Sequence, residues 1–225
     1  MKLNREEFQK YIYSYNEDET FYKTLYLQEK EHPETFHDYC LTLDRKQIYE
    51  HRLYVPELQA EAWYPYMKET DLFHDINGNI VLSKHYRYTP VFPHEHEFFE
   101  ILCMYDGTAH TAIQGIEHTL HTGDICIIPP HTTHSVGIFD DSVAFNILVR
   151  GSTFQSTFFQ SLTADSALTQ FFAHVLYRKT EGNYLIFHSG NDVQIHDMLE
   201  NLYIEYLGHA KYSCTFLNSM LVMFW

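Results

Sequence analysis

Four side chains that can bind a metal ion or a small polar ligand are concentrated in two short stretches of this 225-residue sequence. His94, His96 and Glu100 are separated by even numbers of residues. Because successive side chains of a β-strand point to opposite faces, these three are expected to share one face of a strand. The stretch 123–134 ends on a fourth group, His134, on a later strand. We expect all four to point into one cavity, where imidazoles beside a carboxylate would titrate near neutrality.

Short segments of alternating hydrophobicity surround these residues and would position them. They cover residues 80–88, 97–105, 108–113, 118–121, 125–128 and 143–150. Turn-forming pairs such as Asp106-Gly107 and Gln114-Gly115 separate them. Several short strands at this spacing predict an antiparallel sandwich or barrel, because a closed sheet leaves no exposed edges. We therefore expect a small β-barrel from about residue 77 to residue 151.

The two stretches resemble the two sequence motifs of the cupin superfamily. The first reads His94, one residue, His96, three residues, Glu100, six residues and glycine; the second reads glycine, five residues, proline, four residues and His134. The departures are His131, where the second motif often has glycine, and Ile138, where it often has asparagine. The resemblance implies a cupin barrel (double-stranded β-helix, or jelly roll). It also implies that the four matching residues bind one divalent metal (Zn, Ni, Fe or Mn), which three imidazoles and a carboxylate suit. Without a metal, the same groups would hydrogen-bond a small polar ligand.

Four further residues are candidates for binding a ligand in the cavity: His110, Asn146, His131 and Met104. His110 lies on a strand whose polar face could equally point to solvent. Asn146, between Phe145 and Ile147, could point inward or form a hydrogen bond at a strand end.

Helical patterns flank the predicted barrel on both sides. Apolar spacing in residues 4–26 predicts short amphipathic helices separated near residues 16–19, whereas residues 29–75 read as irregular chain with one short helix. After Gly151, helices are expected at 152–159, 165–175 and 191–207, the last one ending at Gly208, and another from residue 213. We accordingly divide the chain into an arm (1–76), the barrel (77–151) and a helical segment (152–225).

Beyond the barrel, the chain resembles the N-terminal sensor and dimerisation half of AraC-type transcription regulators. The similar stretches are residues 86–90, 94–102, 123–134, 152–154 and 199–206. The resemblance implies a small polar effector, such as a sugar, and a homodimer. The candidate dimer contact is the stripe Met198, Leu199, Leu202 and Tyr206. The alternative for this stripe is packing against the outer face of the barrel itself.

Charge and composition limit the partners of the chain. Fifteen Lys and Arg against thirty Asp and Glu give a formal charge of -15, which would repel DNA. Contact with DNA is therefore expected only through a helix-turn-helix half that this chain lacks, and the apolar end at Trp225 fits a chain that has been cut. Four scattered cysteines and no long apolar run predict a cytoplasmic chain without a membrane span. The arm and the helical segment on either side of the barrel favour a sensor. The alternative is a metal-dependent cupin enzyme of the dioxygenase or isomerase type.

Overall fold

The computed structural model describes residues 3–59, 66–73, 79–154, 184–190 and 192–208 of the chain. The helices are α1 (Arg5–Tyr13), α2 (Glu17–Glu31), α3 (Phe36–Thr42), α4 (Arg45–Glu50), the 3-10 helix η1 (Pro56–Leu58), α5 (Glu69–Leu72), α6 (Gly151–Thr153) and α8 (Val193–Leu207). The strands are β1 (Tyr66–Met67), β2 (Ile80–Lys84), β3 (Glu95–His96), β4 (Phe99–Asp106), β5 (Thr108–Ile113), β6 (Ile116–His121), β7 (Asp124–Ile128), β8 (His134–Gly137), β9 (Val143–Val149) and β10 (Leu185–His188).

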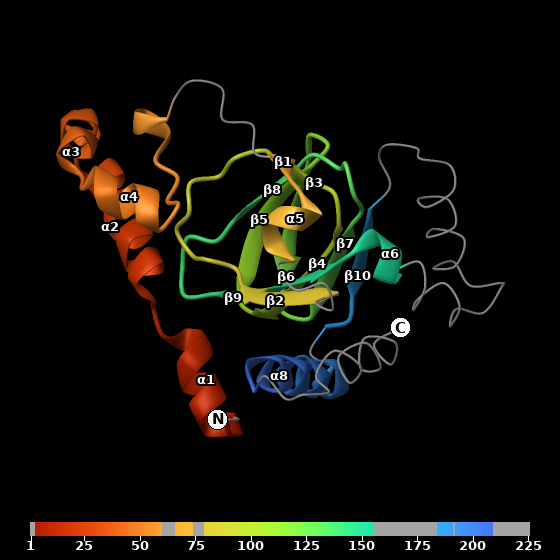
Figure 1. Cartoon of the computed structure of the whole chain (residues 1–225). Helices are drawn as coiled ribbons and strands as arrows, with labels where there is room; N and C mark the ends of the chain where they lie inside the picture. The colour runs from red at the N-terminus through yellow and green to blue at the C-terminus, as the bar shows by residue number, and fades with distance from the viewer. Residues whose placement is uncertain (1–2, 60–65, 74–78, 155–183, 191, 209–225) are drawn as a thin grey trace.

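Two antiparallel sheets face each other in the centre of the molecule (Figure 1). The larger has the strand order β10-β7-β4-β9-β2, and the smaller has the order β6-β5-β8. A short parallel pair, β1 and β3, lies apart from both. The predicted mainly β fold with helical flanks is confirmed. The sheets, however, are not closed into one hydrogen-bonded barrel in the described part of the chain, and side chains rather than backbone ladders join them.

The five-stranded sheet is buried on both faces. On β4, Leu102 and Met104 point toward the smaller sheet, while Phe99 and Ile101 point outward. The outward side chains pack against α1 and α8, through residues that include Phe8. This double burial explains why β4 and β9 are apolar at almost every position instead of at every second one.

The N-terminal arm is more helical than the sequence pattern predicts. The two expected helices are present, and Asn4 and Asn16 each form a capping box at the start of one of them. The expectation of irregular chain with one short helix in residues 29–75 is wrong, since α3, α4, η1 and α5 lie there. These helices have only three to seven residues each, too few to show a helical period. An apolar cluster around Tyr22 and Leu25 holds most of the arm together.

A buried ion-pair network joins the arm to the sheets. Glu19 of α2 is fully buried and accepts hydrogen bonds from Arg87 Nε at 2.8 Å, Arg87 Nη2 at 3.2 Å and Lys84 Nζ at 2.6 Å. The same two cations bind backbone oxygens at the end of α1, with Ser14 accepting from both at 2.9 and 2.8 Å. The guanidinium also lies 3.7 Å from the ring centre of Tyr15. These contacts fix the position of α1 and α2 relative to β2.

Helix α8 confirms the predicted start and end of the helix expected at 191–207. Asp192 caps it by accepting from the Gln194 N–H, and the helix stops before Gly208. It packs with α1 against the outer face of the larger sheet, below the sheets in Figure 1. Of the expected dimer contacts, Leu199 and Leu202 are buried in this core, which is the alternative that the sequence left open.

Other expectations for the C-terminal part differ from the structure or lie outside it. Strand β10 is not predicted by the sequence; it pairs with β7 at the edge of the larger sheet. The expected helix from residue 213 falls outside the described residues, as do those at 152–159 and 165–175 apart from the short α6. Within the described residues, no helix has both the length and the apolar character needed to cross a bilayer.

Candidate functional site

The first motif does not form one continuous strand. His96 ends β3, and a bend at residues 97–98 separates it from β4, which begins at Phe99. His94 is held instead by a backbone bridge to His134, with N···O distances of 2.8 and 3.0 Å. His94, His96 and Glu100 therefore do not lie on one continuous strand, as the alternation predicted from the sequence assumed. The backbone bridge still places the imidazoles of the two motifs side by side, with His94 and His134 ring centres 4.1 Å apart.

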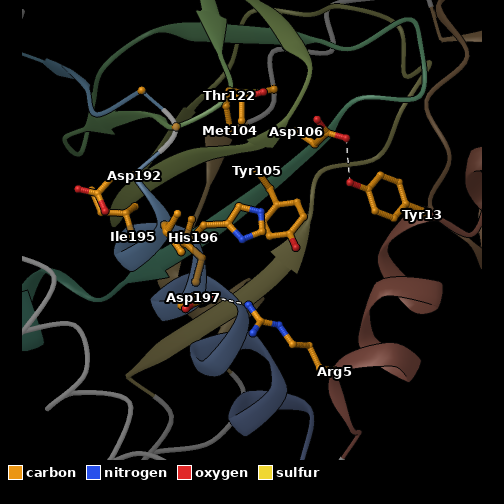
Figure 2. Close-up of a pocket in the computed structure, with 14 residues that line it drawn as sticks. Arg5, Tyr13, Met104, Tyr105, Asp106, Thr122, Asp192, Ile195, His196 and Asp197 are labelled. Atoms are coloured by element: carbon orange, nitrogen blue, oxygen red, sulfur yellow. Dashed lines mark hydrogen bonds and ion pairs between the residues drawn. The ribbon is translucent and has the colours of Figure 1, made fainter.

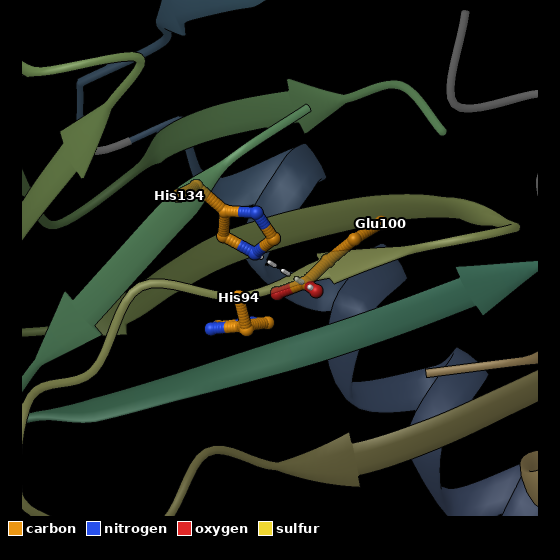
Figure 3. Close-up of side chains that lie close together, drawn as sticks. All are labelled: His94, Glu100 and His134. Carbon is orange, nitrogen blue, oxygen red and sulfur yellow. Dashed lines mark ion pairs between the residues drawn. The ribbon is translucent and has the colours of Figure 1, made fainter. Parts of the chain in front are cut away.

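Three of the four predicted metal ligands form a compact group (Figure 3). His94, Glu100 and His134 each direct one nitrogen or oxygen atom to the group, and these atoms all lie within 4.8 Å of one another. Glu100 comes from the larger sheet and His134 from the smaller sheet, so the group bridges the two. Two imidazole nitrogens and a carboxylate oxygen at this spacing fit a divalent transition metal.

Backbone carbonyls determine which nitrogen of each histidine is available. His134 Nδ1 lies 2.9 Å from the Thr132 carbonyl oxygen, and His94 Nδ1 lies 3.2 Å from that of Phe92. A carbonyl only accepts, so Nδ1 carries the proton in both rings. In a neutral ring, Nε2 then carries a lone pair. Hydrogen bonding of the other ring nitrogen in this way is typical of histidines that bind metals.

The electrostatics of the group favour an anionic Glu100 and a neutral His94. Burial alone would raise the pKa of Glu100, but the nearby rings of His134 and His96 outweigh it and hold that pKa well below its usual value. Burial, with a smaller effect of His134, lowers the pKa of His94 to about 3. The expectation that the imidazoles titrate near neutrality is therefore wrong for His94. A deprotonated ring and an ionised carboxylate are the forms that a metal requires.

His96 lies beside this group but outside it. Its Nε2 is 3.3 Å from Glu100 Oε2, yet neither ring nitrogen has a hydrogen-bond partner, and the ring is fully buried. The ring stacks on Phe98 at a centroid distance of 4.4 Å. The bend after β3 places the ring of His96 against Phe98 as well as beside Glu100.

A cavity of about 370 Å³ opens next to the group. Its wall includes His94 and Glu100, the polar residues His85 and Asn146, and aromatic rings such as Phe92. The arm supplies the facing wall with Tyr22 and residues 51–54. The cavity thus lies between the ligating group and the N-terminal arm.

Unpartnered polar atoms concentrate around this cavity. Among the described residues, five buried side-chain nitrogen or oxygen atoms have no hydrogen-bond partner, and they belong to His85, His96, His134 and Asn146. Such atoms are rare in folded proteins, because leaving them unpaired is costly. Their concentration fits a site that binds a polar group.

The family is shown by comparison with known proteins. The family described as AraC-like ligand binding domain matches residues 78–203, more than half of the chain. The chain belongs to this family. The matched residues contain both sheets, the ligating group and most of α8.

Solved structures resemble parts of this AraC-like domain. Apo ToxT K231A from Vibrio cholerae is 12% identical, with a TM-score of 0.45, and the match covers 64% of this chain and about half (53%) of ToxT. KdgF from Halomonas sp. is 23% identical, with a TM-score of 0.29, over 32% of this chain and 69% of KdgF. A cupin-2 domain containing protein from Shewanella frigidimarina is 25% identical, with a TM-score of 0.27, over 32% and 69% of the two chains. No curated protein matches the chain.

Of the four further ligand candidates, the structure places only Asn146 at the cavity. His110 is exposed on the outer face of the smaller sheet. His131 is also exposed, at a positive φ of 60°, and stacks on Tyr66. Met104 is buried between the two sheets. The expectation that His110, His131 and Met104 line this cavity is wrong, because strand direction and the turn at His131 point them elsewhere.

A second cavity of the AraC-like domain, of about 390 Å³, lies between α1, α8 and the end of β4 (Figure 2). Its polar side chains are largely paired with one another: Tyr13 donates to Asp106 at 2.8 Å, and Arg5 pairs with Asp197. Glu200, buried next to it, accepts from Tyr105. Among the described residues that line this cavity, none has a buried polar side-chain atom without a partner.

Sequence reasoning missed two kinds of residue at the first cavity. His85 has no motif around it. It falls inside the predicted strand segment 80–88, and the structure places it just after β2, where Ser83 pairs with Asn146. The arm residues, including Tyr54, could not be found, because only the tertiary structure brings them to the cavity.

Proposed function

We propose that this chain is the effector-sensing and dimerisation part of an AraC-type transcription regulator. It binds a small polar effector, such as a sugar, in the 370 Å³ cavity, and a divalent metal held by His94, Glu100 and His134 takes part in that binding. His96 is the fourth predicted ligand. The observation that carries the proposal is the concentration of unpartnered buried polar atoms around one cavity in an AraC-like ligand-binding domain.

The position of the cavity suggests how binding could be transmitted. One wall comes from the sheets and the other from the arm, so an effector contacts both. An effector that prefers one arrangement of the arm would shift the population toward that arrangement. In this proposal, DNA is contacted by helix-turn-helix units outside these 225 residues, which is consistent with the charge of -15.

A metal at the group would supply a Lewis acid that polarises an oxygen of the bound ligand. The residues of the chain would contribute the remaining steps of recognition. Glu100 stays ionised and His94 stays neutral at pH 7, so their ligand atoms need no proton loss before binding. The aromatic wall around Phe92 excludes water from the bound ligand.

A screen of small polar metabolites by thermal shift tests the proposal, using neutral sugars, polyols, amides and organic acids with and without a divalent metal. A specific binder at about 100 times its Kd is expected to raise Tm by roughly 5–10 °C. Hydrogen exchange with that binder should slow in α2 and residues 51–54, which form the arm wall, but not in the distant strand β6 (Ile116–His121). Absence of any binder, or protection confined to segments away from the cavity, would contradict the proposal.

Leu199 and Leu202 are buried in the core of the chain, so they are excluded from the proposed dimer contact. Met198 and Tyr206, the two partly exposed residues of the stripe, remain as the proposed contact. Met198→Asp is expected to weaken self-association at least about tenfold, because it places a charge in an apolar contact. Sedimentation velocity measures this, with Val193→Asp on the same helix, 70% exposed, as the control. Leu202→Asp should instead unfold the chain. Unchanged association of Met198→Asp would remove this stripe from the interface.

A metal-dependent cupin enzyme is the second candidate function. It is favoured by the contact of His94 and Glu100 with the cavity, which would let a substrate reach an open position on a bound metal. Mass spectrometry of the bound compound after incubation with metal-loaded protein separates the two functions. A sensor returns its effector unchanged, whereas an enzyme converts it.

A further inference from the structure

Two unpartnered atoms of the cavity lie outside the ligating group. They are His85 Nε2 and Asn146 Oδ1, both shielded from solvent and without a hydrogen-bond partner. The other three unpartnered atoms belong to His96 and His134. The ligating group therefore does not account for His85 and Asn146.

The two residues are held side by side by neighbouring strands. Asn146 on β9 lies opposite Ser83 of β2, and its flanking residues Phe145 and Ile147 point to the outer core, so Asn146 points inward. His85 follows β2, and its backbone N–H donates to the Ala144 carbonyl at 2.9 Å. Asn146 Nδ2 then lies 3.5 Å from His85 Nδ1. Both residues line the same cavity as Glu100.

This contact leaves at least one donor and one acceptor for a ligand. If Asn146 Nδ2 donates to His85 Nδ1, then Nε2 of a neutral His85 carries a free N–H, and Asn146 Oδ1 is a free acceptor. If the amide and the imidazole are reversed, the donor and the acceptor exchange places, but one of each remains. Burial lowers the pKa of His85, which keeps the ring neutral at pH 7 and prevents it from offering two donors.

We infer that His85 and Asn146 form a recognition pair that selects an uncharged effector with a hydroxyl or carboxamide group. The inference rests on the proposed function, in which the effector occupies this cavity. A hydroxyl or carboxamide donates and accepts at once, so it satisfies both free atoms. A carboxylate only accepts, and it has no hydrogen to donate to the acceptor of the pair. Two cationic side chains line the cavity. The ammonium group of Lys84 is engaged by Glu19 and Ser14, and Arg52 is exposed to solvent.

Acetamide and acetate provide a matched test, since they have the same size and differ in charge and in the ability to donate. NMR of protein with ¹³C-labelled histidine would follow the Cε1–H signal of His85, assigned by its loss in His85→Phe. Acetamide is expected to shift this signal saturably, and acetate is not. Asn146→Ala should weaken acetamide binding at least about fivefold, because both hydrogen-bonding groups of the side chain are lost. Thr119→Ala, on an exposed position of β6 outside this cavity, is the control and should bind acetamide as the wild type does.

Three results would overturn the inference: no saturable shift with acetamide, binding of acetate as tight as that of acetamide, or unchanged acetamide affinity in Asn146→Ala. The comparison of acetamide with acetate uses the wild-type chain, so it remains decisive even if a variant is unstable. The result of the acetamide test can be distinguished from the result of the metabolite screen that tests the proposed function. An effector found in the metabolite screen would still stand if acetamide failed, whereas acetamide binding at His85 would stand if no metal bound at His94, Glu100 and His134.

Discussion

Glu19→Gln is expected to lower the free energy of unfolding by about 3–5 kcal/mol, one of the two largest effects that the structure predicts. The change leaves Arg87 and Lys84 buried without their anion, since Glu19 is fully buried and Arg87 is 1% exposed. Removing one member of a buried ion pair costs the desolvation of the charge that remains. Urea unfolding followed by circular dichroism at pH 7 measures the effect.

Glu17→Gln is the matched control, because Glu17 is exposed in the first turn of the same helix. It is expected to change stability by no more than about 0.5 kcal/mol. Equal stability of Glu19→Gln and the wild type would show that the network does not hold the arm in place.

The same carboxylate predicts a pH dependence. Burial alone would raise the pKa of Glu19, but the hydrogen bonds from Arg87 and Lys84 outweigh it and lower the pKa below the usual 4.5. The contribution of Glu19 is therefore fully present above that value and is lost as the pH falls through the lowered pKa. Lys84 behaves differently, because burial of its ammonium group outweighs the attraction of Glu19 and lowers its pKa. Arg87, whose guanidinium donates to Glu19 through two nitrogens, is the principal partner. Glu19→Gln should lose stability less steeply in acid than the wild type.

Glu100→Gln is expected to lower the affinity for a divalent metal at least about a hundredfold. Loss of an outer partner of a ligand already costs about 10–100-fold, and Glu100 provides the anionic ligand of the group. Elemental analysis of the purified chain and calorimetric titration with Zn²⁺ or Ni²⁺ would measure stoichiometry and affinity. The wild type should bind one ion per chain.

Control variants test whether metal affinity depends on His94, Glu100 and His134 and not on other histidines. His110→Ala removes an exposed imidazole on the outer face of the smaller sheet and should leave metal affinity unchanged. His94→Ala should reproduce the loss seen with Glu100→Gln, while His96→Ala distinguishes a three-ligand from a four-ligand site by the size of its effect. Stoichiometric metal that survives both His94→Ala and Glu100→Gln would rule out this site.

Local sequence signals predicted many of the elements well. Strand β5 begins and ends as expected, and α8 starts at its predicted cap and stops before Gly208. These elements carry their signals within a few residues: alternation and a turn for β5, and a capping side chain and a glycine for α8. The short arm helices and β10 have no such signals, since packing against the rest of the chain determines them.

The candidate site was predictable in its residue types but not in its geometry. The spacing of His94, Glu100 and His134 marked them as a group, and the structure brings them together. The position of His96 depends on the bend at residues 97–98, which the regular alternation of a strand does not represent. Likewise, whether Met104 faces a ligand or the core depends on what the opposite sheet places against it.

By itself, the sequence determined the mainly β fold with helical flanks, the AraC-like family and the ligating residue types, because these depend on local pattern and motif spacing. Only the tertiary structure decided that the arm forms one wall of the cavity and that His85 joins Asn146 there. It also decided that Leu199 and Leu202 belong to the core. These features require residues far apart in the chain to meet, and that meeting depends on the packing of whole elements rather than on any local signal.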